Sequence, residues 1–512
     1  MINPLDTEFG TITDLIREHA LNSPHQRALV QGERSLDYAG LDALMDQVAC
    51  ALQRDGFKAG DAIAICAGMS IEYAAVFLAA LRIGVVVAPL APGSGASSLQ
   101  RMVSDAQARL VFTDTLGAES LGACGPDAIA RIALDGSSVG RPLEGWLAQA
   151  GQKPSPVVVQ AGWPFNIIYS SGTTGDPKGI VQSHGMRWSH VRRGAAYNYG
   201  SETVTILSTP LYSNTTLVVF FPTLSFGGTV VLMPKFDALG YLKLAQTHHA
   251  THTMLVPVQY QRLMSHPDFD QFDLSSFQVK FSTSAPFGAA IKADVLKRWP
   301  GALVEFYGMT EGGGTCILEA HAHPDKLHTV GRAAEGHDIR LIDDNGVEVG
   351  IGEAGEVVGN SGGMMTGYHR QPDKTREAEW FDPQGKRFIR TGDIGRFDTD
   401  GFLTLFDRKK DMLISGGFNV YPSDLEAVLR QHPAVFEAAV VGVPSVQWGE
   451  TPVAFVVLHP GKSVPATELL AWANEQVGKT QRLSSVQYLD ELPRSAIGKV
   501  LKRELRAAYT SA

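Results

Sequence analysis

Tyr169-Ser-Ser-Gly-Thr-Thr-Gly-Asp-Pro-Lys-Gly179 is the most informative stretch of this 512-residue chain. The apolar run from Phe165 to Tyr169 that leads into it predicts a buried strand. Glycines directly after a strand let backbone N–H groups converge, and Ser and Thr hydroxyls add further hydrogen-bond donors. With Lys178 as a compact positive charge, the stretch predicts a loop that wraps a polyphosphate.

Two other interpretations of this stretch start from the same residues. A Walker A loop with Lys178 in the lysine position needs Gly at 177 and Ser or Thr at 179, but the sequence has Pro177 and Gly179. The hydroxyl that would bind Mg²⁺ directly after the lysine is therefore absent. An ordinary loop rich in Gly, Ser and Thr also fits the composition, so composition alone does not decide between a phosphate loop and a plain turn.

Four further stretches follow in the same order as the motifs of a known family: Tyr307-Gly-Met-Thr-Glu311, Arg390-Thr-Gly-Asp393, Asp407-Arg-Lys-Lys-Asp411 and Pro493-Arg-Ser-Ala-Ile-Gly-Lys499. Together with residues 169–179 they resemble the signatures of the adenylate-forming superfamily, which includes acyl-CoA synthetases, non-ribosomal peptide adenylation domains and firefly-type luciferases. The motifs span about two thirds of the chain. The resemblance implies an enzyme that activates a carboxylic acid with ATP as acyl-AMP, releasing pyrophosphate, and then transfers the acyl group to a thiol.

Bulk composition agrees with a large enzyme that acts on small molecules. Hydrophobic residues make up 44 % and charged residues 19 % of the chain, and the net charge of −9 argues against a nucleic-acid or anionic-membrane surface. The four cysteines show no metal-ligand spacing, which favours reduced thiols in a cytoplasmic protein. The N-terminus lacks the basic and apolar pattern of a signal peptide, and polar or Pro/Gly interruptions in the most apolar stretches predict no membrane span.

Strand-like and helix-like runs alternate along most of the chain and predict an α/β fold. Ala62–Cys66, Val85–Pro89 and Arg109–Thr113 have the pattern of strands, while Ile71–Leu81 and Leu99–Ala106 have that of helices. We expect a large N-terminal domain of several α/β subdomains over residues 1–406, which binds AMP and the acid.

The remaining residues predict a small α+β domain over 412–512. Helices are expected from Pro422 to His432, from Ala466 to Val477 and from Lys499 onward, with strands at Glu437–Val443 and Pro452–His459. A charged run such as residues 407–411 is ordinarily a solvated turn. The resemblance instead implies a hinge there, with Lys410 at the pivot, on which a mobile small domain rotates between the two half-reactions.

The resemblance also implies roles in ATP binding. It places the ring of Tyr307 against adenine and the carboxylate of Asp393, with Arg408 beside it, on the ribose hydroxyls. From the residues alone, Tyr307 could equally pack in the core, and Asp393 and Arg408 could form a surface ion pair. The implied ATP-binding positions are Ser170, Ser171, Gly172, Thr173, Thr174, Gly175, Lys178, Ser284, Ala285, Pro286, Tyr307, Gly308, Met309, Thr310, Asp393, Arg408 and Lys499.

Attack of a carboxylate on the α-phosphorus brings two anions together, so the site must supply positive charge and hydrogen-bond donors. The resemblance implies that Lys178, Thr310 and Lys499 are catalytic and that Glu311 holds Mg²⁺. A hard divalent cation held by one carboxylate and by substrate phosphates is the usual arrangement for Mg²⁺. An exposed lysine without a catalytic role is the alternative for Lys499.

Other residues bear on the thiol acceptor and on the acid. In CoA-using relatives, glycines matching Gly416 and Gly417 let the pantetheine arm approach, so a CoA acceptor is favoured. Tyr212, Ser213, Asn214 and Met309 are the expected acid pocket, and Ser213 stands where relatives commonly carry His. The hydroxyl and amide groups of residues 213–215 favour an acid with a polar or aromatic tail. The glycines at 312–314 either widen this pocket or turn the chain.

We therefore expect an ATP- and Mg²⁺-dependent acyl-CoA synthetase, similar to fatty acyl-CoA and 4-coumarate-CoA ligases, whose partners are a small carboxylic acid, ATP and CoA. Neither nucleic acid nor a membrane is an expected partner, and the sequence leaves room for a homo-oligomer. Two alternatives stay open: an acyl-AMP ligase that loads a separate carrier protein, and a non-catalytic nucleotide-binding homologue.

Overall fold

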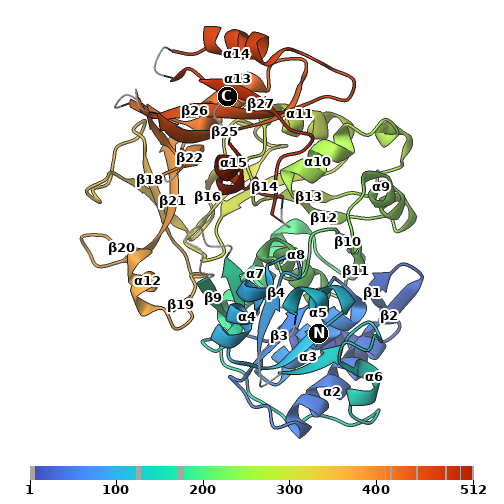
Figure 1. The fold of residues 1–512 in the computed structure, drawn as a ribbon. Coiled ribbons are helices and arrows are strands. Elements are labelled where there is room, and N and C mark those ends of the chain that lie inside the picture. The colour runs from blue at the N-terminus through green and yellow to red at the C-terminus, as the bar shows by residue number, and fades with distance from the viewer. Residues whose placement is uncertain are drawn as a thin grey trace.

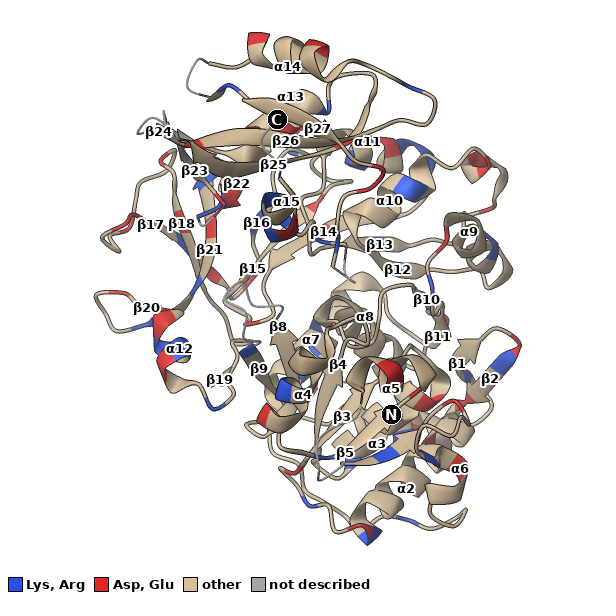
Figure 2. Cartoon of the chain, in the orientation of Figure 1, with Lys and Arg blue, Asp and Glu red and all other residues tan. Residues whose placement is uncertain are grey.

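A computed structural model of the chain describes residues 6–122, 129–170, 178–409, 411–415, 418–445, 448–478, 481–495 and 498–509. Figure 1 shows the N-terminal and central parts of the chain below and the C-terminal part above them. Basic and acidic residues are interspersed over both parts (Figure 2). In the described ranges, no helix combines the length and apolar character needed to cross a membrane.

The first sheet is mostly parallel and contains strands from distant parts of the chain. Its spatial order is β16 (Arg332–Ala333), β15 (Thr315–Glu319), β14 (Ala302–Gly308), β13 (Val279–Ser282), β12 (His252–Leu255), β10 (Val204–Leu207), β11 (Thr229–Leu232), β1 (Arg27–Gln31) and β2 (Arg34–Asp37). All pairs from β14 through to β1 are parallel, so the carboxyl ends of these strands lie at one edge. The strands β10, β11, β12 and β13 are buried at nearly every position, as expected for parallel strands that are covered on both faces.

The second sheet carries the strands on both sides of residues 171–177. Its order is β19 (Gly367–Tyr368), β9 (Lys178–Ser183), β8 (Pro164–Ser170), β4 (Val86–Leu90), β3 (Ala62–Cys66), β5 (Ala108–Thr113), β6 (Ala130–Ala133) and β7 (Arg141–Pro142). The strands β8 and β9 pair antiparallel with Ser170 opposite Lys178. The short strand β19 adds to the other edge of β9 and sets Tyr368 beside Ile180.

Helices fill the space between the two sheets and cover their outer faces (Figure 1). The largest apolar cluster joins both sheets through the inner helices α1 (Ile12–Asn22), α2 (Tyr38–Arg54), α3 (Ile71–Arg82), α7 (His184–Gly194) and α8 (Asn214–Ser225). The outer face of the first sheet is covered by α9 (Ala238–Thr247), α10 (Pro257–Met264) and α11 (Ala289–Arg298). The outer face of the second sheet is covered by α4 (Ala96–Asp105) and α5 (Thr115–Leu121).

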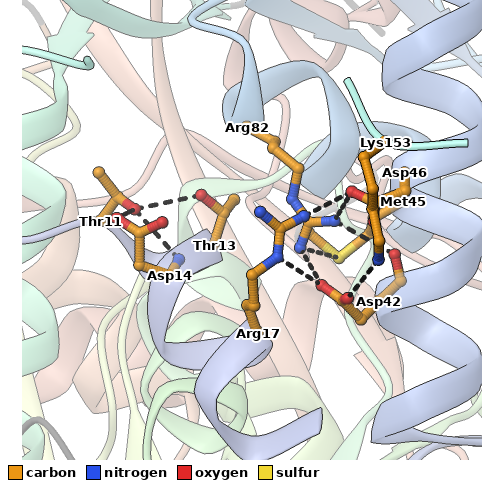
Figure 3. A network of polar contacts seen from close by, with 9 residues as sticks. All are labelled: Thr11, Thr13, Asp14, Arg17, Asp42, Met45, Asp46, Arg82 and Lys153. Carbon is orange, nitrogen blue, oxygen red and sulfur yellow. Dashed lines mark hydrogen bonds and ion pairs between the residues drawn. The ribbon is translucent and has the colours of Figure 1, made fainter. Parts of the chain in front are cut away.

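A buried ionic network holds three of the inner helices together (Figure 3). Arg82 of α3 binds both Asp42 and Asp46 of α2, and its Nη1 lies 2.6 Å from Asp46 Oδ1. Arg17 of α1 and Lys153 of the irregular segment before β8 also bind Asp46, at 2.5 and 2.6 Å. Because Asp46 is only 2 % exposed, losing one of its cations would leave a poorly compensated buried charge. The network thus links α1, α2 and α3.

Two further sheets complete the fold. One contains β17 (Asp338–Ile342), β18 (Gly355–Asn360), β21 (Arg387–Phe397), β20 (Glu379–Phe381) and β22 (Leu403–Arg408). The other belongs to the C-terminal part and contains β24 (Phe418–Val420), β23 (Leu413–Ser415), β26 (Gly449–Leu458), β25 (Val435–Ser445) and β27 (Ser485–Tyr488). Its two faces carry separate apolar clusters, to which α13 (Pro422–Leu429), α14 (Ala466–Glu475) and α15 (Lys502–Ala508) contribute.

The predicted α/β fold with a small C-terminal α+β part is confirmed, and most of the predicted elements are present within one to three residues at their ends. The prediction that the last helix begins at Lys499 is wrong, because α15 begins at Lys502. Gly498 adopts a left-handed φ of +77°, and Arg494 forms an isolated antiparallel bridge with Val500. These two features place Lys499 in a loop before the helix.

Candidate active site

The carboxyl edge of the first sheet brings together most of the predicted site residues. Tyr212, Ser213 and Asn214 follow β10, Ser284 follows β13, and residues 309–311 follow β14. In open α/β sheets, ligands bind outside the carboxyl ends of the strands, where the connecting loops present side chains and backbone groups. Segments far apart in the sequence therefore meet at a single edge.

Ser284 has a strained backbone at this edge. Its φ of +81° lies in the left-handed region, which is unfavourable for a residue with a Cβ, and its hydroxyl bonds Thr215 Oγ1 at 2.5 Å. Such strain persists only where surrounding contacts enforce it, and it clusters at functional sites. The next residues, Ala285 and Pro286, are half-buried and exposed, so this turn reaches the surface of the site.

Tyr307, Asp393 and Arg408 form one contact group, as the resemblance implied for neighbouring positions. The Tyr307 hydroxyl donates to Asp393 Oδ2 at 2.8 Å, and Arg408 Nε lies 3.3 Å from Asp393 Oδ1. Burial, and then the charge of Asp393, raise the pKa of Tyr307 well above its ordinary value, so it remains a donor. A pocket of about 340 Å³ opens beside them, lined by Thr391, Gly392, Arg408 and Lys409.

Tyr368 joins two predicted site residues and was missed by the sequence reasoning. Its hydroxyl donates to Glu311 Oε1 at 2.9 Å, and Lys178 Nζ lies 4.9 Å from the centre of its ring. Burial, and then Glu311, raise the pKa of Tyr368, which keeps its proton on the carboxylate. The only sequence signal was a short Gly367-Tyr368 pair, which becomes informative once β19 is known to pair with β9.

Glu311 has the ligand chemistry that Mg²⁺ requires. Its backbone carbonyl accepts from Met365 N at 2.7 Å, which fixes the main chain, and one carboxylate oxygen accepts from Tyr368, which orients the side chain. No group of three or more His, Cys, Asp or Glu residues that could hold a metal occurs among the described residues. A single hard carboxylate fits a cation that takes its remaining ligands from phosphate oxygens and water.

The glycines at 312–314 pack tightly behind Glu311 and leave no space for a wider pocket. A Cβ on Gly312 would lie 1.9 Å from the carbonyl oxygen of Gly363, and one on Gly314 would lie 2.2 Å from Ile339 Cδ1. Both residues also have a positive φ, of +72° and +95°. Of the two interpretations of this triplet, the structure therefore supports the chain turn.

Gly308 is the last residue of β14, and Met309 and Thr310 connect it to Glu311. Met309 packs on a small apolar cluster that contains Ile180 and Tyr368. The carbonyl of Thr310 accepts from Gln182 Nε2 at 2.8 Å, which anchors this loop to β9. The loop is thus attached to the strand that begins at Lys178.

Three of the predicted acid-pocket residues, Tyr212, Ser213 and Asn214, lie at or just before the start of α8 and make different contacts there. Ser213 is buried and its hydroxyl caps the helix by accepting from Thr215 N at 3.2 Å, so it does not offer the exposed group that a gating residue would need. Tyr212 is half-buried, and burial, followed by Cys66 at the end of β3, raises its pKa to about 12. Asn214 is half-buried, and its Oδ1 lies 3.5 Å from Gln182 Nε2.

The loop that carries Lys499 lies against the large N-terminal region. A Cβ on Gly498 would lie 3.1 Å from Val258 Cγ1 and 3.2 Å from Val256 Cγ2, at the point where β12 passes into α10. Arg494 donates to the Gly498 carbonyl at 2.6 Å and pairs with Glu437 at 2.9 Å, which ties the loop to β25. Because β12 lies between β10 and β13, this contact brings the loop to the edge that carries Ser213 and Ser284.

Asp407, Lys409 and Asp411 lie in the predicted hinge and do not all contact the same part of the molecule. Asp407 accepts from Ser423 N at 3.1 Å, and Asp411 pairs with Arg506 at 3.0 Å, so both face the C-terminal part. Lys409 instead pairs with Asp344 at 2.6 Å on the large region. The predicted pivot Lys410 follows Lys409 in the sequence and is outside the described residues.

Other predicted positions also lie outside the described residues: Ser171, Gly172, Thr173, Thr174 and Gly175 of the phosphate loop, and Gly416 and Gly417 of the CoA site. Ser170 ends β8 and pairs with Lys178 on β9. The roles of these phosphate-loop and CoA-site residues remain predictions.

Comparison with known proteins gives a consistent result over nearly the whole chain. The family model described as AMP-binding enzyme matches residues 16–369, and the AMP-binding enzyme C-terminal domain matches residues 424–499. A feruloyl-CoA synthase of Amycolatopsis sp is 32 % identical over 493 residues, covering 95 % of this chain and 96 % of that protein.

Two further relatives extend this result. The long-chain-fatty-acid–CoA ligase FadD13 of Mycobacterium tuberculosis is 30 % identical, with 97 % of this chain and 98 % of that protein covered. Among solved structures, ATP-bound MatB from Rhodopseudomonas palustris superposes with a TM-score of 0.88 at 30 % identity, covering 98 % of this chain and 99 % of that one.

Proposed function

Because this chain belongs to the AMP-binding enzyme family, we propose that it activates a fatty or aromatic carboxylic acid as its acyl-adenylate and transfers the acyl group to CoA. The chain is an AMP-forming acyl-CoA synthetase by family, and ATP and CoA are the substrates that this family uses. The identity of the acid, the acceptor thiol and the residue roles below are our proposal.

The observation that carries the proposal is the position of the Lys499 loop. Gly498 packs on Val256 and Val258, at the sheet edge where the predicted acid and adenosine residues converge. In this orientation Lys499 would supply positive charge between the carboxylate and the α-phosphate during adenylation. Such preorganised charge is usually the largest single contribution to catalysis of a reaction in which negative charge develops.

The other predicted residues divide between the two ends of ATP. Asp393 would accept the ribose hydroxyls, since a carboxylate has two acceptor oxygens, and Tyr307 would stack on adenine while its hydroxyl holds Asp393. At the other end, Lys178 and Thr310 would bind the phosphates. Glu311 would hold Mg²⁺, which when bound neutralises charge on the phosphate oxygens.

The second half-reaction requires the Lys499 loop to leave. Thiol attack on the acyl carbon needs access to the side of the adenylate that this loop covers, and the resemblance assigns that access to the segment with Gly416 and Gly417. Asp407 contacts the C-terminal part and Lys409 contacts the large region, and this change of partner within two residues supports the proposed hinge. Rotation there would have to break the pair between Lys409 and Asp344 or the contacts of Asp407.

The proposal is tested by measuring pyrophosphate release with acetate, octanoate, palmitate, benzoate, 4-coumarate and ferulate, each with and without CoA. We expect release with the fatty or the aromatic acids, accompanied by the CoA thioester. Release that never consumes CoA would contradict CoA as the acceptor and favour loading of a carrier protein. Absence of release with every acid would contradict the proposed acid classes.

We expect Lys499→Ala to slow acid-dependent pyrophosphate release by about a hundredfold or more, because a preorganised charge is lost. Gly498→Ala should also slow pyrophosphate release, because its new Cβ would push the loop away from Val256 and Val258. CoA thioester formation from a supplied acyl-adenylate should be little changed in both variants. Stopped-flow measurement of each half-reaction checks this.

Gly461→Ala is the matched control for Gly498→Ala. Gly461 has a similar φ of +76° in the same part of the chain, but a Cβ there would have no atom within 4 Å. It should therefore reproduce the backbone strain and leave both half-reactions intact. Equal loss of both half-reactions in Lys499→Ala would remove that residue from its proposed role.

Tyr368→Phe should raise the Mg²⁺ concentration needed for half-maximal pyrophosphate release by about tenfold, because groups that orient a metal ligand commonly contribute this much. Direct titration of ATP binding against Mg²⁺ gives a readout that does not depend on turnover. Tyr488→Phe is the control, since it also removes one hydroxyl donor, to the Val464 carbonyl at 2.9 Å, far from Glu311. An unchanged Mg²⁺ dependence in Tyr368→Phe would contradict the role of Tyr368.

A further inference from the structure

A buried polar cluster lies next to the site and is not used in the mechanism above. Asn166 of β8 and Gln182 of β9 are cross-strand neighbours, and neither side chain is exposed to solvent. Arg187 of α7 lies on both of them and is only 1 % exposed. Buried amides and a buried guanidinium are costly to desolvate, so their arrangement calls for an explanation.

Arg187 has no carboxylate partner among the described residues. Its Nε and Nη2 donate to Asn166 Oδ1 at 3.4 and 3.3 Å, and its Nη2 also donates to Gln182 Oε1. The guanidinium carbon lies 5.7 Å from the ring centres of both Phe165 and Phe221. Burial lowers the pKa of Arg187 to about 9, which still leaves it charged at neutral pH. The cation is thus held by amide oxygens and aromatic faces.

The partners of Gln182 determine which way its amide points. A guanidinium can only donate, so the oxygen of Gln182 must face Arg187. The NH₂ group must then face the opposite side, where the Thr310 carbonyl, which can only accept, lies 2.8 Å away. Both partners of Gln182, the Arg187 guanidinium and the Thr310 carbonyl, therefore require the same orientation of its amide.

The orientation of the Gln182 amide in turn determines the orientation of the Asn214 amide. Gln182 Nε2 also lies 3.5 Å from Asn214 Oδ1, so the oxygen of Asn214 is the atom that meets this donor. Its Nδ2 donates to no other described residue, and the residue is half-exposed at the start of α8. Asn214 consequently presents a donor, and not an acceptor, to whatever binds there.

Neighbouring hydroxyls on this turn are already engaged. Ser213 Oγ caps α8, Thr215 Oγ1 bonds Ser284 Oγ, and Thr216 Oγ1 bonds Thr209 Oγ1 at 2.7 Å. The sequence suggested that residues 213–215 would all offer polar groups to the acid. Because these hydroxyls already have partners, the NH₂ group of Asn214 is the polar group on this turn that can bind the acid.

We propose that Arg187 and Gln182 are positioning residues that hold Asn214 as a hydrogen-bond donor to the tail of the acid, so that the enzyme prefers acids whose tail carries an acceptor oxygen. The proposal rests on the proposed function, because it takes Asn214 as part of the acid pocket. An Asn side chain without these partners could rotate its amide and would not discriminate between donors and acceptors.

The test compares acids of equal size that differ by one acceptor atom. One pair is 4-methoxycinnamate and 4-ethylcinnamate, and the other is 6-methoxyhexanoate and octanoate. An ether oxygen accepts a hydrogen bond and donates none. The wild-type enzyme should prefer the ether in at least one pair by roughly three- to tenfold in kcat/KM, the size of one neutral hydrogen bond.

Asn214→Asp removes the donor and keeps the shape, so the ratio should fall to about one or below while KM for ATP stays unchanged. Gln182→Leu combined with Arg187→Leu replaces the buried pair with apolar side chains and should also reduce the ratio. Gln53→Leu is the control. Gln53 makes a similar pair of amide contacts, at 2.9 and 2.8 Å with the backbone of Ser155, but lies in α2 away from the site. It should keep the wild-type ratio.

The outcomes separate this inference from the function on which it rests. Turnover of the acids without an ether preference, or a preference that survives in Asn214→Asp, overturns the inference and leaves the function standing. Absence of pyrophosphate release with all four acids contradicts the proposed function instead. Asn214→Asp lies on the half-exposed turn, so the test does not depend on the double variant folding.

Discussion

The parallel arrangement of β10, β12, β13 and β14 is the constraint on which the rest of the structure depends. Parallel strands place all their carboxyl ends at one edge, so each connecting loop must begin there. This arrangement brings together Asn214, Ser284 and Glu311, which are far apart in the sequence. The buried helices between the two sheets pack against these strands in the largest apolar cluster, and Ser284 keeps a left-handed backbone at that edge.

The second sheet contributes the other half of the site through β9. Lys178 begins this strand at the phosphate end, and Gln182 lies four residues further along on the same face. Tyr368 connects Lys178 with Glu311, while Gln182 connects Thr310 with Asn214. The same strand thus links the proposed phosphate and metal groups to the proposed acid pocket. The Lys499 loop contacts Val256 and Val258, where β12 passes into α10.

Motifs with a distinctive order of residues could be predicted from the sequence, whereas contacts made by single common residues could not. The α/β fold followed from the alternation of strand-like and helix-like runs. The family and the neighbouring positions of Tyr307, Asp393 and Arg408 followed from five short stretches. Tyr368 and Gln182 escaped notice because their importance depends on which strand pairs with β9. Lys499 was placed on a helix because the apolar pattern does not reveal a left-handed Gly498. The capping of α8 by Ser213 was also not predicted, because the sequence does not show where this helix begins.

Isotope tracing of the carboxylate oxygen tests the central claim most directly. The acid is labelled with ¹⁸O in both carboxylate oxygens and turned over with ATP and CoA, and the AMP is analysed by mass spectrometry. If the carboxylate attacks the α-phosphorus, the bridging oxygen stays with AMP when the thiol displaces it, and the account predicts AMP that carries one ¹⁸O. Unlabelled AMP, or label in inorganic phosphate, would contradict the acyl-adenylate and with it the proposed roles of Lys178, Glu311 and Lys499.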